Sequence, residues 1–195
     1  MQRESQVLRP TIDIVVPAFN EADNIGVLIE KLHDGLAQLP YAFEIVVVDD
    51  GSADATASVA EECAGLFPVR VIRLTRNFGK EAALLAGLDA ARGAATIIMD
   101  ADLQHPVEIV PQMLARWEQG YECVYAVQAE RQQSWIRRVA TAAFYAGINR
   151  GADVAIPPNA GDFRLLDSAV VRALCSIRER VRFTKGLYEI GRAHV

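Results

Sequence analysis

Two patterns of apolar residues alternate along the first 127 residues of the chain. Short runs rich in Val and Ile predict buried strands, and longer segments with apolar residues three and four positions apart predict helices. The predicted strands cover residues 12–16, 44–48, 69–74, 95–99 and 121–127. The predicted helices cover residues 24–39, 53–64, 80–91 and 107–117. This alternation predicts an α/β fold with a mostly parallel sheet and helices on both faces.

Polar residues gather where four of these strands end. The clusters are Asn20-Glu21, Asp49-Asp50, Arg76-Asn77 and the pair Asp100 and Asp102. Because parallel strands end at one edge of their sheet, where ligands bind in such folds, the four clusters predict a single polar crevice.

The pattern changes after residue 127. Residues 133–149 predict a helix with Trp135 and Phe144 on an apolar side and arginines mostly elsewhere. Such a helix suits either ordinary packing on a sheet or a membrane interface. Residues 163–166 predict a short strand, and Asp167 is a candidate N-cap for a helix that runs to about residue 177.

Composition and charge narrow the class of protein. The 195 residues are 51% apolar and 23% charged, which fits one globular domain and excludes a disordered chain. Residues 1–127 carry 9 Lys/Arg against 19 Asp/Glu, and residues 128–195 carry 11 against 6. The overall charge of -5 argues against a nucleic-acid binder. The acidic part suits a metal-bearing pocket, whereas the basic part suits phosphates or an anionic membrane surface.

Asp100 and Asp102 are the clearest candidates for metal ligands. They follow a buried strand two residues apart, so both carboxylates point the same way in an extended chain. A hard divalent cation relieves their mutual repulsion, and Gln104 adds a further oxygen. The chain contains neither a GxxxxGK[ST] phosphate loop nor a GxGxxG turn after the first strand.

Six segments in one order carry a resemblance to a known family. They are VVPAFNE at 15–21, VDDGSAD at 48–54, RNFGK at 76–80, MDADLQHP at 99–106, IPPNAGDFRLLD at 156–167 and RFTKGL at 182–187. Over residues 11–188 the chain resembles the family 2 glycosyltransferases of the GT-A fold. It is most similar to the branch that acts on polyprenyl phosphates, with dolichyl-phosphate mannose synthases and undecaprenyl-phosphate glycosyltransferases.

The resemblance implies an inverting, metal-dependent transfer of a sugar from a UDP- or GDP-linked donor to undecaprenyl or dolichyl phosphate. The implied metal is Mg²⁺ or Mn²⁺, held by Asp102 and Gln104 with Asp100 beside it or beside the ribose. The other implied roles are nucleotide binding by Pro17, Phe19 and Glu21, base contacts by Asp50 with Asp49, donor binding by Lys80 and Arg131, and phosphate contacts by Arg164, Arg182 and Lys185. Asp162 is the candidate general base, although orienting Arg164 or the acceptor is an equally good role.

The same resemblance suggests how the chain is organised. A polar tail (1–10) precedes a catalytic domain (11–188), in which 11–127 bind the nucleotide-sugar and 128–188 lie near the acceptor and the membrane. Residues 189–195 depart from the family pattern and are interpreted as a truncated or appended end. We expect a protein at the cytoplasmic face of a membrane, anchored in its full-length form by C-terminal helices, contacting the surface through the Trp135 helix and able to form homo-oligomers.

Three alternatives stay open. Another family 2 enzyme of polysaccharide or cell-envelope synthesis is one, although the QxxRW motif of processive synthases is absent from the sequence. A phosphoacceptor receiver would explain Asp49-Asp50 and Lys80 but leaves Asp100 and Asp102 without a role. A non-catalytic domain that binds nucleotide-sugars is the third.

Overall fold

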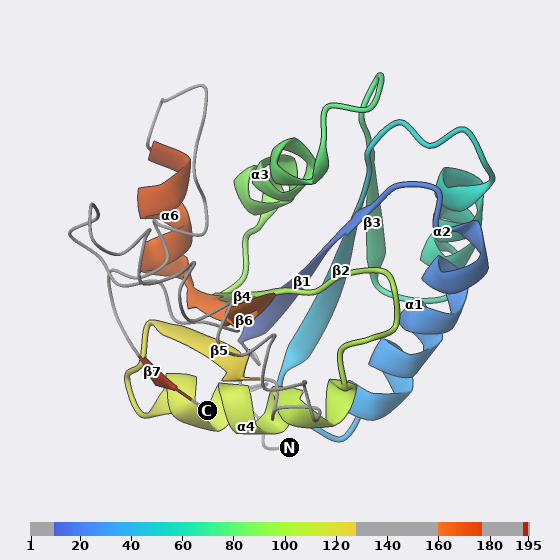
Figure 1. Cartoon of the computed structure of the whole chain (residues 1–195). Helices are drawn as coiled ribbons and strands as arrows, with labels where there is room; N and C mark the ends of the chain where they lie inside the picture. Colours follow the sequence, from blue (N-terminus) through green and yellow to red (C-terminus); the bar gives the residue numbers. More distant parts are fainter. Residues whose placement is uncertain (1–9, 128–159, 177–192, 195) are drawn as a thin grey trace, which may run out of the picture. The chain divides into compact units, whose positions relative to one another are not determined.

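The computed structural model describes residues 10–127, 160–176 and 193–194 (Figure 1). The chain divides into two compact units, Met1–Glu108 and Ile109–Val195. Each unit is described by itself below.

A parallel sheet forms the centre of the first unit, with the strands in the order β3-β2-β1-β4. Its strands are β1 (Thr11–Ala18), β2 (Ala42–Asp49), β3 (Val69–Arg73) and β4 (Ala95–Ile98). All three pairings are parallel, so all four strands end at one edge. The interior positions of β1, β2 and β4 are mostly apolar and buried, as strands covered on both faces require, and Asp13 and Thr96 are the buried polar residues among them.

Helices cover both faces of this sheet, as Figure 1 shows. On one face α3 (Lys80–Ala90) packs closely, because Gly87 brings its backbone against the side chains of Val15 and Val48. On the other face α1 (Ala22–Leu36) turns its apolar stripe toward the sheet, beside α2 (Thr56–Ala64). Val15 and the adjacent Ile14 face opposite helices, which is the side-chain alternation of a β-strand.

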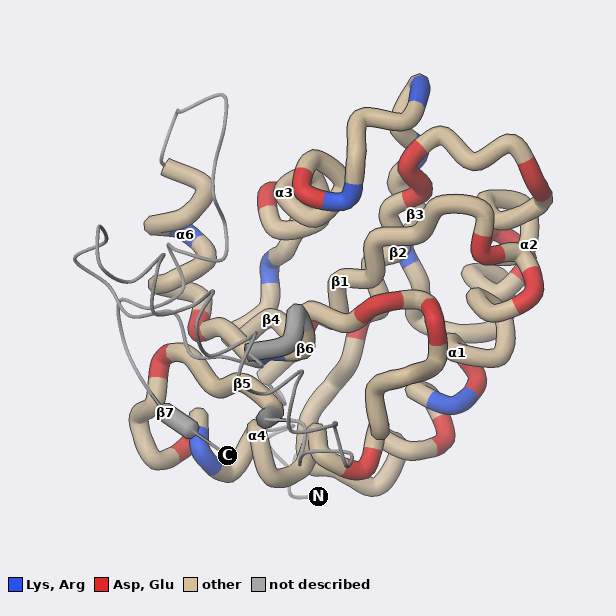
Figure 2. Tube along the Cα trace, in the orientation of Figure 1, with Lys and Arg blue, Asp and Glu red and all other residues tan. Residues whose placement is uncertain are grey.

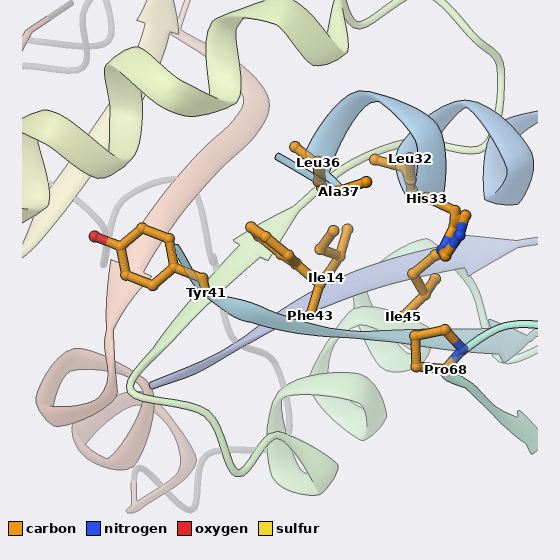
Figure 3. A pocket seen from close by; sticks show the side chains of 9 residues that line it. All are labelled: Ile14, Leu32, His33, Leu36, Ala37, Tyr41, Phe43, Ile45 and Pro68. Carbon is orange, nitrogen blue, oxygen red and sulfur yellow. The ribbon is translucent and has the colours of Figure 1, made fainter. Parts of the chain in front are cut away.

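A small apolar hollow remains between the end of α1 and the sheet (Figure 3). It has a volume of about 160 Å³. The residues that line it come from β1, α1, β2 and the loops beside them: Ile14, Leu32, His33, Leu36, Ala37, Tyr41, Phe43, Ile45 and Pro68. α1 therefore covers the sheet incompletely near its C-terminus.

The second unit pairs strands of both directions. β5 (Cys123–Val127) lies antiparallel to β6 (Ala160–Asp167) and parallel to the short β7 (Ala193–His194). α4 (Val110–Glu118) is tied to β6 because the Trp117 indole N–H donates to Asp167 Oδ2 at 2.8 Å. The other carboxylate oxygen of Asp167 accepts the Ala169 N–H at 2.7 Å, which caps α6 (Ser168–Ser176) as the sequence predicts.

The α/β class and mostly parallel sheet are confirmed, while several element ends differ from the prediction. β1 runs through Pro17, whose missing N–H costs no ladder bond because β4 pairs only as far as Val15 with Ile98. α2 begins at Thr56 and not at residue 53, and α1 ends at Leu36 and not at residue 39. The helix expected from residue 107 is a 3₁₀ turn, Val107–Ile109, followed by α4.

The described helices are short. None of those in residues 10–127 and 160–176 combines the length and the apolar character needed to cross a lipid bilayer. The segment 133–149, with Trp135, lies outside the described residues.

Candidate active site

The strand ends of the first unit enclose a pocket of about 330 Å³. Its lining comes from the end of β1, from the segments that follow all four strands and from the start of α3, which confirms the predicted crevice: Pro17, Ala18, Phe19, Glu21, Asp50, Asn77, Gly79, Lys80, Ala83, Asp100, Ala101 and Asp102. Four of these side chains are carboxylates and one is a lysine. The pocket is therefore acidic among the residues described.

The turn after β1 is locked to the turn after β2 by reciprocal hydrogen bonds. The backbone N–H of Asn20 donates to Ser52 Oγ at 2.9 Å, and the Asn20 side-chain oxygen accepts the Ala53 N–H at 3.0 Å. Asn20 has φ of 55°, a left-handed conformation that asparagine tolerates better than most residues. The lock fixes the backbone on either side of Asn20, from which Phe19 and Glu21 reach the pocket.

Thr56 and Asp54 hold the start of α1 from the neighbouring loop. The buried Thr56 hydroxyl accepts the Glu21 N–H at 2.8 Å and donates to Asp54 Oδ1. Asp54 Oδ2 accepts the Ala22 N–H at 3.2 Å. The hydrogen bond from the Thr56 hydroxyl, and then those from backbone N–H groups, lower the pKa of Asp54 below its ordinary value. Both residues thus serve the loops around the pocket and do not line it.

Glu21 lies at the junction of this lock and the pocket. Its carboxylate accepts the Asn24 side-chain N–H at 2.7 Å, and its backbone carbonyl accepts the N–H groups of Asn24 and Ile25. These bonds fix the first turn of α1 and leave the Glu21 side chain half-buried in the pocket wall.

Asp50 is buried and already engaged by the protein backbone. One carboxylate oxygen accepts the Phe78 N–H at 2.8 Å, and the other accepts the Gly79 N–H at 2.9 Å. Each oxygen has a second lone pair, so Asp50 can line the pocket and still accept a bond from a base. Its neighbour Asp49 accepts the Ser52 N–H at 3.2 Å and is not among the lining residues.

The loop between β3 and α3 lies tightly against the β2 turn. Gly51 has φ of 66°, and a Cβ at this position would lie 2.7 Å from the Arg76 Cα and 2.7 Å from the Asn77 nitrogen. Only glycine allows both the conformation and this approach. Further along the loop, the Arg76 guanidinium lies 4.8 Å from the centre of the exposed Phe78 ring, a cation–π contact.

Lys80 and Asp100 form an ion pair in the pocket. Lys80 Nζ, at the first residue of α3, lies 2.7 Å from Asp100 Oδ1. The exposed Asp102 accepts the Gln104 backbone N–H at 3.0 Å. The Gln104 side chain is exposed and does not line the pocket.

The donor set suits a hard divalent cation. Within residues 10–127 and 160–176 no three His, Cys, Asp or Glu side chains are grouped to hold a metal by themselves. Mg²⁺ usually takes only one or two protein carboxylates and completes its shell with water and phosphate oxygens. Asp100 and Asp102 therefore fit a metal that is shared with a bound diphosphate.

The pocket gathers most of the predicted binding residues of the first unit. Those that line it are Pro17, Phe19, Glu21, Asp50, Lys80, Asp100 and Asp102. Arg164 is 4% exposed in β6, opposite Tyr125 in the second unit. Arg131, Arg182, Lys185 and the side chain of Asp162 lie outside the described residues.

Asn77 is a pocket residue to which the sequence analysis assigned no role of its own. The sequence places it in the strand-end cluster Arg76-Asn77, and the structure shows that it lines the pocket. The close packing of the Arg76 and Asn77 backbone against Gly51 places Asn77 beside the pocket. This packing joins two loops that are distant in the sequence, so the local pattern does not predict it.

Comparison with known proteins agrees with this geometry. The model of Glycosyl transferase family 2 matches residues 13–175. The chain belongs to this family. It is 40% identical over 178 residues to the bactoprenol glucosyl transferase of Shigella phage SfV, which covers 90% of the chain and 58% of that protein. The chain spans somewhat more than half the length of the curated relatives it matches.

Solved structures support the GT-A-like fold of this family 2 chain. Mannosyl-3-phosphoglycerate synthase from Rubrobacter xylanophilus matches with a TM-score of 0.63 and 22% identity, over 83% of the chain and 55% of that protein. The mannosyltransferase PcManGT from Pyrobaculum calidifontis, solved with GDP-Man and Mn²⁺, matches with a TM-score of 0.58 and 25% identity, over 86% of the chain and 47% of that protein.

Proposed function

We propose that this family 2 glycosyltransferase transfers a sugar from a nucleoside-diphosphate-sugar to a polyprenyl phosphate, in a reaction that depends on Mg²⁺ or Mn²⁺. The observation that carries the proposal is the acidic pocket at the strand ends, in a chain 40% identical to a bactoprenol glucosyl transferase. Because that acceptor is a lipid, we also propose that the protein acts at the cytoplasmic surface of a membrane.

Different pocket residues would bind different parts of the donor. Phe19 is 44% exposed in the pocket wall and offers a face for a base to stack on. Glu21 and Asp50 offer carboxylate oxygens to base or ribose hydrogen-bond donors. Asp100 and Asp102 would hold the cation, which when bound offsets the negative charge that develops on the leaving diphosphate.

The acceptor needs little activation. A phosphate monoester with a second pKa of about 6 is mostly dianionic at neutral pH. One of its oxygens attacks the anomeric carbon of the sugar while the bond from that carbon to the diphosphate oxygen breaks on the opposite side, so the configuration inverts. Asp162 stays a candidate for orienting the acceptor or Arg164, because a dianionic nucleophile does not require a strong general base.

The test is a transfer assay with the full chain in detergent. A panel of UDP- and GDP-linked sugars is offered with undecaprenyl or dolichyl phosphate, with Mg²⁺, Mn²⁺ or EDTA, and lipid-linked product is measured. We expect product with one donor class, loss of product in EDTA, and a decrease of about a hundredfold or more in Asp102→Asn because charge stabilisation in the transition state is lost.

Asp34→Asn is the matched control, since Asp34 is an exposed carboxylate in the last turn of α1, far along the helix from the pocket. This variant should keep the parental rate. Calorimetric binding of a nucleotide-sugar without product from any acceptor would instead indicate a non-catalytic binding domain. Full activity of Asp102→Asn would contradict the role assigned to that carboxylate.

A further inference from the structure

The ammonium group of Lys80 forms an ion pair with Asp100, one of the two carboxylates that we propose as metal ligands. Nζ lies 2.7 Å from Asp100 Oδ1, and Lys80 is the only cationic side chain among the described residues that line the pocket. The Lys80 and Asp100 side chains are 44% and 23% exposed. The pair is therefore open to solvent and to an incoming ligand.

The backbone beneath Lys80 is held firmly. Gly79, with φ of 96°, is the N-cap of α3, and its N–H and that of Phe78 both bind the buried Asp50 carboxylate. The loop before it is packed against Gly51. The Lys80 Cα is thus fixed, while the four methylene groups of its flexible side chain let Nζ reach positions several ångströms apart.

Electrostatics explains why the ammonium rests on Asp100. Glu21, Asp50, Asp100 and Asp102 place four carboxylates around one small pocket, and a bound cation lowers their mutual repulsion. A divalent ion competes with the ammonium for Asp100 and also repels it. A diphosphate, in contrast, offers Nζ a new anionic partner beside the same carboxylates.

The geometry points to Lys80 as an internal counter-ion that couples metal binding to donor binding. Lys80 keeps Asp100 paired in the ligand-free protein, and the donor diphosphate draws the ammonium away so that the metal and the nucleotide bind firmly only together. This inference rests on the proposed function. It predicts positive coupling between the two ligands, which by linkage acts equally in both directions.

The test measures Mn²⁺ binding without nucleotide, by the electron paramagnetic resonance signal of free Mn²⁺. Lys80→Met keeps the length of the side chain and removes its charge. We expect Lys80→Met to bind Mn²⁺ about fivefold more tightly than the parent, because the competing ion pair is of the strength of a partly exposed salt bridge. Calorimetry with UDP and GDP in EDTA should show weaker nucleotide binding by the same variant.

Two control variants distinguish the loss of the Lys80–Asp100 ion pair from the loss of a positive charge elsewhere in the protein. Lys80→Arg should bind Mn²⁺ as the parent does, and so should Lys31→Met, which removes an exposed cation from α1. Unchanged or weaker Mn²⁺ binding by Lys80→Met would overturn the inference, whereas product formed by the parent protein in the panel assay would still support the proposed function. Absence of Mn²⁺ binding in every variant, even with nucleotide, would overturn both the inference and the metal dependence of the proposed function.

Discussion

At the scale of single residues, the acidic groups at the strand ends have two roles: some hold loops through backbone hydrogen bonds, and some line the pocket. Asp49 and Asp54 accept backbone N–H groups and do not line the pocket. Asp50 and Asp102 also accept backbone N–H groups but line the pocket, as Asp100 does. The sequence predicts that carboxylates gather here, but it does not separate the two roles. The partners of Asp50 lie 28 and 29 residues away, so its structural role appears only when two loops meet.

Thr56→Val should raise the pKa of Asp54 toward its ordinary value of 3.8. Valine keeps the volume of threonine but removes the hydroxyl that is the main cause of the lowered pKa. It also leaves the Glu21 N–H without its acceptor, so we expect a loss of roughly 1–3 kcal/mol in the free energy of unfolding at pH 7. Carboxyl NMR titration and denaturant unfolding measure the two effects.

The sign of the pH dependence follows from the direction of the shift. Because the pKa of Asp54 is lower in the folded than in the unfolded chain, its ionised form stabilises the fold above about pH 4. That contribution disappears as the pH falls through the folded-state pKa. Ser58→Ala, an exposed change on α2, should leave the Asp54 titration unchanged. An identical titration in Thr56→Val would refute the assigned cause.

At the scale of elements, apolar periodicity predicted the strands and helices of the first unit, and tertiary contacts set their ends. α3 begins at Lys80, as predicted. α2 begins three residues later than its pattern suggests, because Asp54 and Thr56 form a turn that binds the start of α1. Pro17 predicted the end of a strand, but it is tolerated where β4 has already stopped pairing. Local pattern carries no information about such neighbours.

Gly87→Ala should destabilise the protein, although the same change in an exposed helix stabilises by about 1 kcal/mol. The added methyl group would collide with Val15 and lie 3.1 Å from Val48 Cγ2, so α3 would have to move off the sheet. We expect a loss of about 1–3 kcal/mol in the free energy of unfolding, measured by denaturant titration.

A double-mutant cycle checks the cause of that loss. In a Val15→Ala background the space beside residue 87 is larger, so Gly87→Ala should cost clearly less there than in the parent. Equal costs in the two backgrounds would show that the contact with Val15 does not control the packing of α3.

At the scale of the whole chain, the sequence predicted the α/β fold and the family, and both are confirmed. It also predicted one crevice from four strand ends, and the pocket contains residues that follow each strand. The donor base is not predictable in this way. In the proposed function Glu21 and Asp50 contact the base or the ribose. The backbone of Glu21 and the carboxylate of Asp50 are held by hydrogen bonds between loops that are distant in the sequence.

Ligand binding should stabilise the folded chain as a whole. At a free concentration of a hundred times Kd, a ligand adds about 2.7 kcal/mol, which for a chain of this size raises Tm by roughly 5–10 °C. We expect this shift in thermal unfolding with Mn²⁺ and the preferred nucleoside diphosphate together, and a smaller shift when EDTA replaces Mn²⁺. In Asp102→Asn the increment due to Mn²⁺ should vanish, and its persistence would place the metal elsewhere.

The double engagement of Asp50 limits how this protein can be re-engineered. A substitution at position 50 intended to change nucleotide preference would also release the amides of Phe78 and Gly79 and loosen the start of α3. Phe19 and Asn77 line the same pocket, and among the contacts described neither side chain holds a loop by a hydrogen bond. Libraries that seek a new donor should therefore vary those two positions and keep the aspartate fixed.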